Sequence, residues 1–221
     1  MFWRRILLVA LVTCAVVMSG CATGPLTKHP ESGKWQPVLA DDLSNCTFKE
    51  GSWTYEDGVL TRKGGGDIWT KKRYGDFVLD LEFKVAEGTN SGVFIRTDDI
   101  KQWLHTGIEI QVLDSHGKEN VGKHDCGAVY DVKAPSVNAV KPAGEWNHMT
   151  ITAEGSLIDV ELNGKHIIDI DLNDWPEAHE NPDGTKNKFN IAYAEMSRDG
   201  VFGFQDHGKP VWYRNIRVKR L

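Results

Sequence analysis

Residues 77–85 read FVLDLEFKV, and this run decides the fold class. Apolar side chains recur at every second position from Phe77 to Val85, a period of two that a helix cannot use and a half-buried strand requires. Runs of similar length and pattern recur at residues 92–97, 107–113, 148–153, 157–162, 167–170, 189–194 and 211–218. The sequence therefore predicts many short strands.

Turn signals separate these runs, at Glu87-Gly88, Glu154-Gly155 and Asn163-Gly164. Asn-Gly is the strongest short hairpin cue of the three. No stretch of ten or more residues shows helical periodicity, although residues 172–179 have room for a turn or two of helix. Because the chain also lacks a βαβ rhythm and internal repeats, it fits a two-sheet antiparallel sandwich or a barrel.

Two long connections, residues 114–126 and 171–188, help to decide between the sandwich and the barrel. Such connections suit a jelly roll better than tight up-and-down closure, so we predict an all-β, two-sheet antiparallel β-sandwich with jelly-roll topology. Long loops without structure of their own are usually functional, and we expect both to rim a cleft.

The first twenty residues predict a secretory signal. Arg4-Arg5 gives a basic start, and an apolar run over residues 6–18 ends at Ser19-Gly20-Cys21. A small-small-Cys ending is typical of bacterial lipoproteins, so we expect Cys21 to be lipidated and to anchor the protein to a membrane. The residue after it is Ala rather than Asp, which favours the outer membrane, facing the periplasm or the surface. Ordinary secretion is the alternative, since Met stands where lipoproteins usually have Leu.

The chain then divides into a signal peptide (1–20), a tether rich in Gly, Pro and Ser (21–34) and one folded domain (35–221). Cys46 and Cys126 remain in a compartment that permits disulfides, and a bridge between them or two separate buried thiols are both open.

Charge and composition limit the class of ligand. The net charge is −5 and no Lys/Arg run is longer than three residues, which argues against a nucleic-acid partner. Eight Trp residues in an acidic chain favour neutral, ring-shaped ligands such as sugars. The chain carries no Gly-x-Ser-x-Gly elbow, phosphate loop or dinucleotide fingerprint, so those enzyme classes are set aside.

The run GIEIQVLD at residues 107–114 is the candidate active-site strand. Its apolar residues share one face, which leaves Glu109 and Gln111 together on the other, lining a cleft or exposed to solvent. The run SGVFIR at residues 91–96 is its predicted hairpin neighbour, and alternation places Arg96 on the face of Glu109. Arg96 is then either a salt-bridge partner or the group that orients Glu109 and keeps it ionised.

Other candidate residues lie in loops and at strand ends. Trp103 offers a plane for a sugar ring or packs in a satellite core, and Tyr130 binds a sugar hydroxyl, donates a proton or packs with a satisfied hydroxyl. Gln205, Asp206 and His207 follow each other between two glycines, as a binding and acid–base segment or as a turn that bonds its own backbone.

A metal site built from side chains alone is not predicted. His116, His124 and Asp125 share one loop, but no pair has the facing spacing of a zinc or non-haem iron motif.

Together these residues resemble the 3-keto-disaccharide hydrolase domain family over nearly the whole folded part. The resemblance rests on six ordered runs, which are SGVFIR (91–96), GIEIQVLD (107–114), GAVYD (127–131), PAGEWN (142–147), LNG (162–164) and QDHGKPVWYRNI (205–216). It implies a concanavalin-like jelly roll and a periplasmic or surface-facing enzyme that cleaves 3-keto-glycosides, with an oxidised sugar as its substrate.

The chain is also similar to the sandwich glycosidases of family 16, whose catalytic strand reads Glu-x-Asp-x-x-Glu. The corresponding residues are Glu109, Gln111 and Asp114. A retaining glycosidase needs two carboxyl groups about 5 Å apart, and Gln111 cannot supply one. The ordinary two-carboxylate mechanism is therefore in doubt.

A 3-keto sugar offers a different route, β-elimination after loss of the C2 proton. Our hypothesis gives the base and acid roles to Glu109 or His207 and the enolate charge to Arg96 or a recruited divalent cation. Substrate contacts are assigned to Gln111, Asp114, Trp103, Tyr130, Gln205 and Asp206. The rival hypotheses are a non-catalytic carbohydrate-binding module and a conventional glycosidase with Glu109 and Asp114 as its carboxyl pair.

Overall fold

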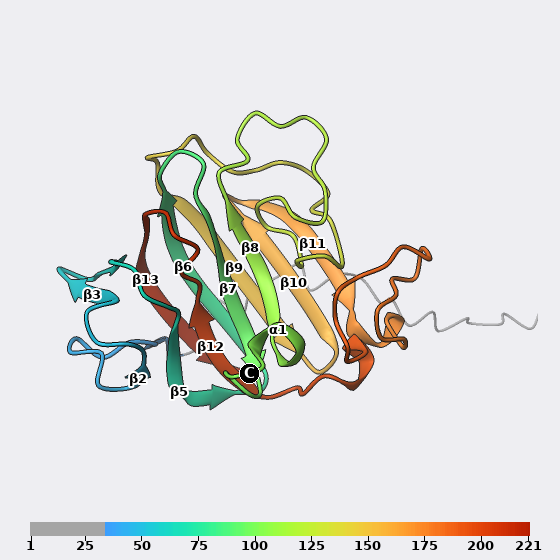
Figure 1. Cartoon of the computed structure of the whole chain (residues 1–221), viewed down its shortest axis with the longest axis horizontal. Helices are drawn as coiled ribbons and strands as arrows, with labels where there is room; N and C mark the ends of the chain where they lie inside the picture. Colours follow the sequence, from blue (N-terminus) through green and yellow to red (C-terminus); the bar gives the residue numbers. More distant parts are fainter. Residues whose placement is uncertain (1–33) are drawn as a thin grey trace, which may run out of the picture.

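A computed structural model describes residues 34–221. Within that range the chain forms two antiparallel sheets packed face to face, with short connections and long loops at their ends (Figure 1). The predicted fold class, an all-β two-sheet sandwich, is confirmed. The expected signal peptide, nearly all of the tether and the lipidation site Cys21 lie outside the described residues.

The larger sheet has the order β11-β10-β9-β6-β13-β4-β3, with β1 paired to β13. Its strands are β1 (Gln36–Pro37), β3 (Trp53–Glu56), β4 (Val59–Arg62), β6 (Phe77–Val85), β9 (Asn147–Glu154), β10 (Leu157–Leu162), β11 (Lys165–Asp171) and β13 (Val211–Arg220). The smaller sheet has the order β2-β5-β12-β7-β8. Its strands are β2 (Cys46–Thr47), β5 (Ile68–Tyr74), β7 (Asn90–Thr97), β8 (Ile108–Leu113) and β12 (Gly200–Phe204).

The core lies between the two sheets and follows the predicted alternation. Alternate residues of β6, from Phe77 to Val85, are fully buried in it, and from the smaller sheet Ile108, Ile110 and Val112 of β8 face them. Each buried side chain of this size stabilises the fold by about 1.5–3 kcal/mol. Since one face of β8 is used by the core, its other face is free to carry the site.

The Asn163-Gly164 turn joins β10 to β11 as predicted. Both residues have positive φ, 52° and 75°, which is the backbone of the two-residue hairpin turn that matches strand twist. The flanking strands pair from Leu157 opposite Asp171 to Leu162 opposite Lys165.

One predicted strand is wrong. Residues 189–194 form no ladder and end in the short 3-10 helix η2 (Tyr193–Glu195). The Phe189 and Tyr193 rings pack together with centroids 5.2 Å apart, so the apolar residues are buried without a strand partner. Strands β1 to β5 and β12 were not predicted. The expected helical turn near residues 172–179 is the 3-10 helix η1 (Leu172–Asp174).

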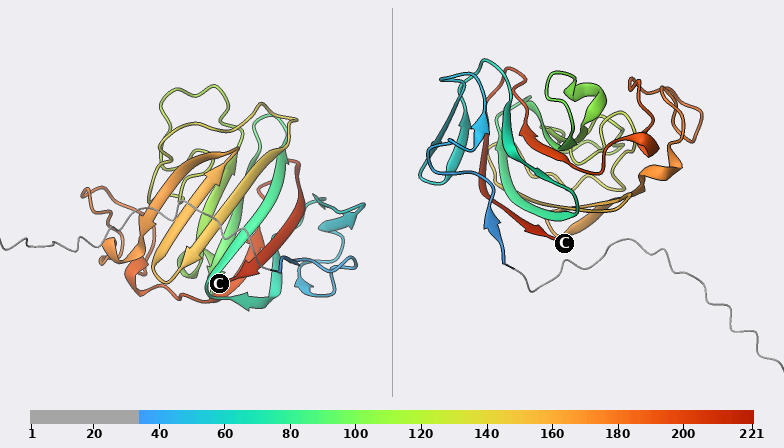
Figure 2. Two further views of the ribbon diagram at one scale, coloured as in Figure 1. Left: turned by 180° about the vertical axis from the view of Figure 1, so that it is seen from behind. Right: turned by 90° about the horizontal axis from the view of Figure 1, so that it is seen from below.

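The two sheets differ in what covers their outer faces. The short helix α1 (Trp103–Thr106) and the long loops lie against the smaller sheet, whereas no helix of residues 34–221 lies over the strands of the larger sheet seen from behind (Figure 2). A cleft that these loops rim must therefore lie on the outer face of the smaller sheet.

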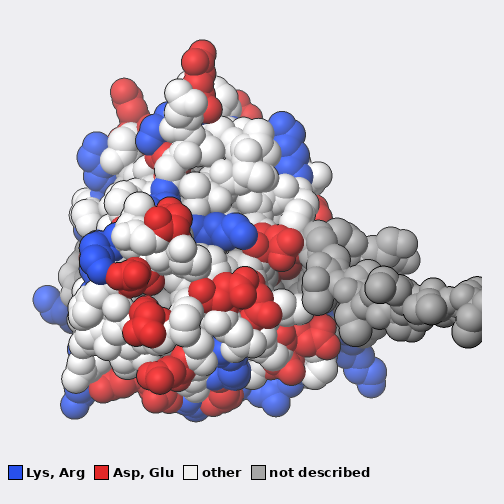
Figure 3. All heavy atoms as spheres, turned by 90° about the vertical axis from the view of Figure 1, so that its right-hand side faces the viewer, with Lys and Arg blue, Asp and Glu red and all other residues white. Residues whose placement is uncertain are grey.

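The described part of the chain contains no helix long and apolar enough to span a bilayer. On the face that Figure 3 shows, at the β11 side of the molecule, acidic and basic side chains are interspersed.

Candidate active site

Glu109 and Gln111 point outward from β8, away from the core. Strand β7 is the neighbour of β8, as predicted, with Phe94 opposite Glu109 and Gly92 opposite Gln111. A Cβ atom on Gly92 would lie 2.3 Å from Oε1 of Glu109, closer than real atoms approach. Gly92 therefore leaves the space in which the Glu109 carboxyl lies.

The segment after β12 brings a second polar group to the same place. The Gln205 N–H donates to the Gly92 carbonyl at 3.0 Å, which sets Gln205 beside the floor of the site. Its side-chain amide is close enough to the Glu109 carboxyl to lower the pKa of that carboxyl. His207, two residues further, also lines the cleft and is exposed.

The free edge of β8 holds the third group. Residues 127–130 run along it, with Gln111 N–H donating to Ala128 O at 2.9 Å and Tyr130 N–H donating to Glu109 O at 3.0 Å. Lys188 Nζ donates to the Tyr130 hydroxyl at 2.9 Å and sits 4.4 Å from the centre of its ring. A cationic donor and a phenol thus stand beside Glu109.

Asp131 fixes Lys188 from behind. Its carboxylate accepts the Lys188 backbone N–H at 2.9 Å and His124 Nε2 at 2.9 Å. His124 lies near the end of loop 114–126 and Lys188 is the last residue of loop 171–188, and the His124 carbonyl accepts Gln111 Nε2 at 3.1 Å. Loop 171–188 therefore rims the cleft, as predicted, whereas loop 114–126 supports Gln111 and supplies no residue to the lining.

The resulting cleft has a volume of about 250 Å³. It is lined by Asn90, Trp103, Leu104, Glu109, Gln111, Tyr130, Lys188, Gln205 and His207. Trp103, on α1, packs on Phe94 with centroids 4.9 Å apart, and Phe94 stacks on Trp69 at 5.1 Å. Aromatic side chains therefore line one side of the cleft, and polar side chains line its base. Six predicted residues come together here: Glu109, His207, Gln111, Trp103, Tyr130 and Gln205.

The electrostatics of Glu109 set it apart. Burial raises the pKa of its carboxyl to about 8, against the nearby Lys188 charge, which lowers it. The Asp67 carboxylate adds to the rise, and the Gln205 amide opposes it. A carboxyl with a pKa near the working pH is suited to moving protons, and such groups mark candidate sites.

Arg96 is not in the cleft, and its predicted pairing with Glu109 does not form. Along β7 and β12, Thr97 faces Val201 and Phe94 faces Gly203, so β7 carries one extra residue, and Arg96 has φ 51°. This bulge reverses the alternation and buries Arg96 completely. Its guanidinium donates to Gly75 O at 3.0 Å, Gly155 O at 2.7 Å and the Asp76 carboxylate at 3.0 Å.

Asp114 also lies elsewhere, because five positions from Glu109 place it on the opposite side and β8 ends at Leu113. Its carboxylate accepts the Gly88 N–H at 2.7 Å.

Asp206 bonds to backbone and to Arg62 rather than to the cleft. Its carboxylate accepts Gly65 N–H at 2.7 Å and Gly66 N–H at 2.9 Å and pairs with Arg62. Burial raises the pKa of this carboxyl, but the hydrogen bonds from Arg62 and Gly66 outweigh burial and bring the pKa to about 2. For Asp206 the sequence left two interpretations open, a substrate contact and a turn that bonds backbone. The structure shows the turn.

Sequence reasoning missed Lys188, Asn90 and Leu104. Lys188 had one usable signal, its place at the end of a long loop expected to rim the cleft. Nothing local tells it from the other lysines, since the residue that fixes it, Asp131, is far away in the sequence.

No group of three or more His, Cys, Asp or Glu in residues 34–221 could hold a metal ion. His116 Nδ1 lies 2.9 Å from Val140 O, His124 bonds Asp131, and Asp125 accepts Lys118 Nζ at 2.6 Å. The recruited divalent cation stays a prediction.

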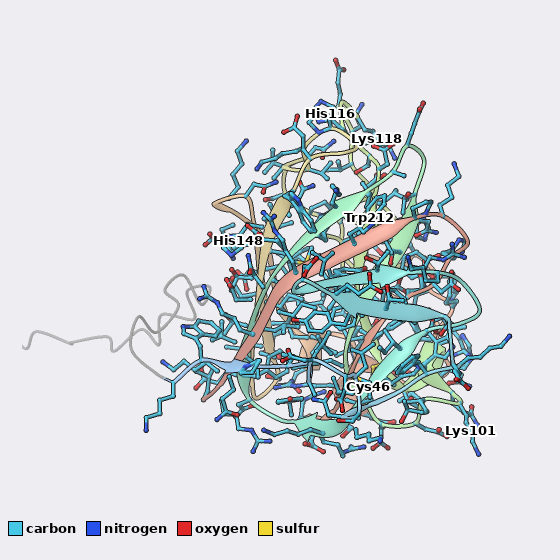
Figure 4. All side chains as sticks on the ribbon, turned by 90° about the vertical axis from the view of Figure 1, so that its left-hand side faces the viewer. Cys46, Lys101, His116, Lys118, His148 and Trp212 are labelled. Atoms are coloured by element: carbon cyan, nitrogen blue, oxygen red, sulfur yellow. The ribbon has the colours of Figure 1, made fainter. Side chains whose placement is uncertain are left out.

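A larger hollow of about 620 Å³ lies on the outer face of the larger sheet and is lined in part by His148, which is labelled in Figure 4. Its buried carboxylate, Asp80, is already satisfied. It accepts His148 Nε2 at 2.7 Å, Arg217 Nε at 2.8 Å and Thr150 Oγ1 at 3.2 Å. These pairs stabilise the strand face, so the smaller cleft is the candidate site.

The fold and cleft define a jelly-roll sandwich with one cleft-lining carboxyl whose pKa is raised by burial. Residues 34–219 match the 3-keto-alpha-glucoside-1,2-lyase-like domain, and the chain belongs to this family. The resemblance predicted from the sequence is confirmed.

Individual relatives agree with the family. A "3-keto-disaccharide hydrolase" of Bacteroides thetaiotaomicron is 28% identical over 203 residues, 76% of this chain and 70% of the relative. A crystallised protein of Parabacteroides distasonis, provisionally named a glycosyl hydrolase, is 38% identical with a TM-score of 0.80, covering 85% of this chain and 100% of that one. A Bacillus subtilis protein with a galectin-like fold shares the fold alone, at 12% identity and TM-score 0.52 over 85% and 94%.

Proposed function

We propose that this protein is a hydrolase that cleaves 3-keto-glycosides, among them 3-keto-disaccharides. Its family and the name of its Bacteroides thetaiotaomicron relative support an enzyme that acts on glycosidic bonds. One observation carries the proposal. Among the described residues that line the cleft, Glu109 is the one carboxyl, and the Lys188 ammonium, which also lines it, acts on Glu109 more strongly than the Asp67 carboxylate outside the lining does.

The first step is loss of the C2 proton to Glu109. A ketone at C3 acidifies this proton, because the charge left behind moves to the C3 oxygen as an enolate. A raised pKa makes the Glu109 carboxylate a stronger base than an ordinary one. Lys188 and Tyr130 stabilise the enolate as hydrogen-bond donors. Since Lys188 donates to the Tyr130 oxygen, the Tyr130 O–H is free to donate to the sugar.

The second step is departure of the group on C1. The enolate re-forms the ketone, a C1=C2 double bond appears, and the C1–O bond breaks. The leaving oxygen takes a proton from His207. Water then adds at C1 and gives one proton back to His207, and Glu109 returns its proton to C2, so that both groups are restored, one water is consumed and the net reaction is hydrolysis.

The two rival functions have less support. A conventional retaining glycosidase would pair Glu109 with Asp114, whose carboxylate caps Gly88 instead. A binding module has the support of the fold alone, and it gives no reason for a proton-transfer group with a pKa near neutrality.

The test compares oxidised and unoxidised forms of one disaccharide with wild type, Glu109→Gln and Asp114→Asn. We expect cleavage of the oxidised sugar only, a loss of about 10²–10⁴-fold in kcat for Glu109→Gln, and near-normal kcat for the control Asp114→Asn. Cleavage of the unoxidised sugar, lost in both variants, would establish the glycosidase. Binding without cleavage of either sugar would establish the module.

We further propose that a lipid on Cys21 anchors the enzyme to the outer membrane, facing the periplasm or the surface. The basic start, apolar run and small-small-Cys ending of residues 4–21 support this. The full chain should incorporate labelled palmitate and sediment with membranes, and Cys21→Ser should do neither. Palmitate labelling of Cys21→Ser would contradict the proposal.

A further inference from the structure

Two buried oxygen atoms in the cleft have no hydrogen-bond partner. They are Oε1 of Gln111 and Oε1 of Gln205, in side chains that are 2% and 7% exposed. A buried polar atom left unpaired costs about 1–3 kcal/mol. Native proteins rarely keep such atoms, and two in one cleft indicate that a ligand supplies their donors.

The orientation of both amides follows from their neighbours. Gln111 Nε2 donates to the His124 carbonyl at 3.1 Å and to Asn90 Oδ1 at 3.2 Å. A carbonyl cannot donate, so the Gln111 amide cannot be turned around, and its oxygen is an acceptor. The Gln205 amide acts on the Glu109 carboxyl as a donor that lowers its pKa, and Oε1 of Gln205 meets no donor among the described residues, so it is a second free acceptor.

The two free acceptor residues, Gln111 and Gln205, lie on either side of the Glu109 carboxyl. Gln111 is the register partner of Gly92, and Gln205 donates its N–H to the Gly92 carbonyl. The Glu109 carboxyl lies over Gly92 between them. The donors Lys188 and Tyr130 stand at the β8 edge of the same cleft. The cleft thus offers acceptors on two sides of the base and donors on a third.

This pattern matches a ketone flanked by two hydroxyl groups. We propose that Gln111 and Gln205 are the specificity residues of the site, each accepting a hydrogen bond from one of the hydroxyls at C2 and C4 while the ketone oxygen meets the donors. The inference rests on the proposed function and narrows its substrate. The oxidised sugar must carry both hydroxyls free, so it is not linked through O2 or O4.

A hard cation is the competing occupant, because amide and carboxylate oxygens are its usual ligands. Lys188 argues against it. Its charge is close enough to act on the Glu109 carboxyl, and it would repel a divalent ion at that place.

The experiment uses the full chain and a chromogenic 3-keto-glucoside, with its 2-deoxy and 4-deoxy forms. Wild type should lose about 10- to 100-fold in kcat/KM for each missing hydroxyl, because an amide oxygen then stays unpaired. Gln111→Met and Gln205→Met should each lose a similar factor on the parent sugar. Each variant should stop discriminating at one position and keep discriminating at the other.

Each other result has a defined meaning. Equal rates of wild type on all three sugars would overturn the inference without touching the proposed function, and this comparison needs no variant to fold. Variants that fold, judged by thermal melting, but discriminate as wild type does would also overturn it. Loss of activity with a chelator, restored by Mg²⁺, would make the two oxygens cation ligands. Failure of wild type on the parent sugar would overturn the proposed function and this inference with it.

Discussion

Glu109 retains its proton over a wider range of pH than an exposed carboxyl does, and this makes its role measurable. Its pKa of about 8 follows mainly from burial. As the base that takes the C2 proton, Glu109 must be ionised in the free enzyme. We therefore expect kcat/KM on a 3-keto-glycoside to rise with pH and level off above about 8. A pH profile that falls through the same range would assign Glu109 the acid role instead.

The same group makes folding depend on pH. Its pKa rises from 4.5 when unfolded to about 8 when folded, so between these values the folded protein binds the extra proton and stability falls as pH rises. Glu109→Gln does not titrate, so the variant does not lose stability in this way as pH rises. We expect its melting temperature to match that of wild type near pH 5 and to exceed it at pH 8, by about 2–4 °C for each kcal/mol. If the melting temperatures of wild type and Glu109→Gln differ by the same amount at pH 5 and at pH 8, burial does not raise the pKa of Glu109.

Gly92 gives a purely steric test of the site. Gly92→Ala places a methyl group 2.3 Å from Oε1 of Glu109, so the carboxyl must move. We expect kcat to fall by about 10-fold or more and the free energy of unfolding by about 1–3 kcal/mol. Gly75→Ala is the control, since its Cβ would be 3.7 Å from the nearest atom, Arg198 O. Equal loss in both variants would mean general destabilisation.

Among the elements, the loop between β12 and β13 depends on one carboxylate. Asp206 ties it to Gly65, Gly66 and Arg62, and His207 is the next residue. Because hydrogen bonds depress the Asp206 pKa to about 2, their stabilisation is complete above pH 3.8 and is lost as pH falls toward 2. Asp206→Asn should lower the free energy of unfolding by about 2 kcal/mol at pH 7 and less at pH 3. The exposed Asp174→Asn is the control.

Features whose signal lies within a few neighbouring residues could be predicted from the sequence. Features that arise from contacts between residues far apart in the chain could not. Alternation places β6 and β10, and Asn163-Gly164 places the β10–β11 turn, because each signal acts within a few residues. The bulge that buries Arg96 arises from the pairing of β7 with β12, far along the chain. Lys188 reaches the cleft because Asp131, 57 residues away, holds its backbone. No local pattern encodes either.

At the scale of the whole molecule, the core and the site use opposite faces of the smaller sheet. Ile108 and Ile110 face the larger sheet, and Glu109 and Gln111 face the cleft. Because alternation separates them, unpaired polar atoms in the cleft do not disturb the packing between the sheets. Gln111→Met and Gln205→Met should therefore change activity and leave the packing between the sheets intact, which makes kinetic tests of these two residues interpretable.

The reactivity of the two cysteines of the folded part reports on whether the whole sandwich is folded. Cys46 and Cys126 are both free and buried, and burial raises the pKa of their thiols to about 11 and about 12. A protein of residues 34–221 should therefore resist a thiol reagent while folded, because access requires unfolding that costs about 5–15 kcal/mol. In denaturant without reductant it should react at two thiols, and Cys46→Ala at one. Reaction at none would show a disulfide, and rapid reaction of the folded protein would contradict the burial.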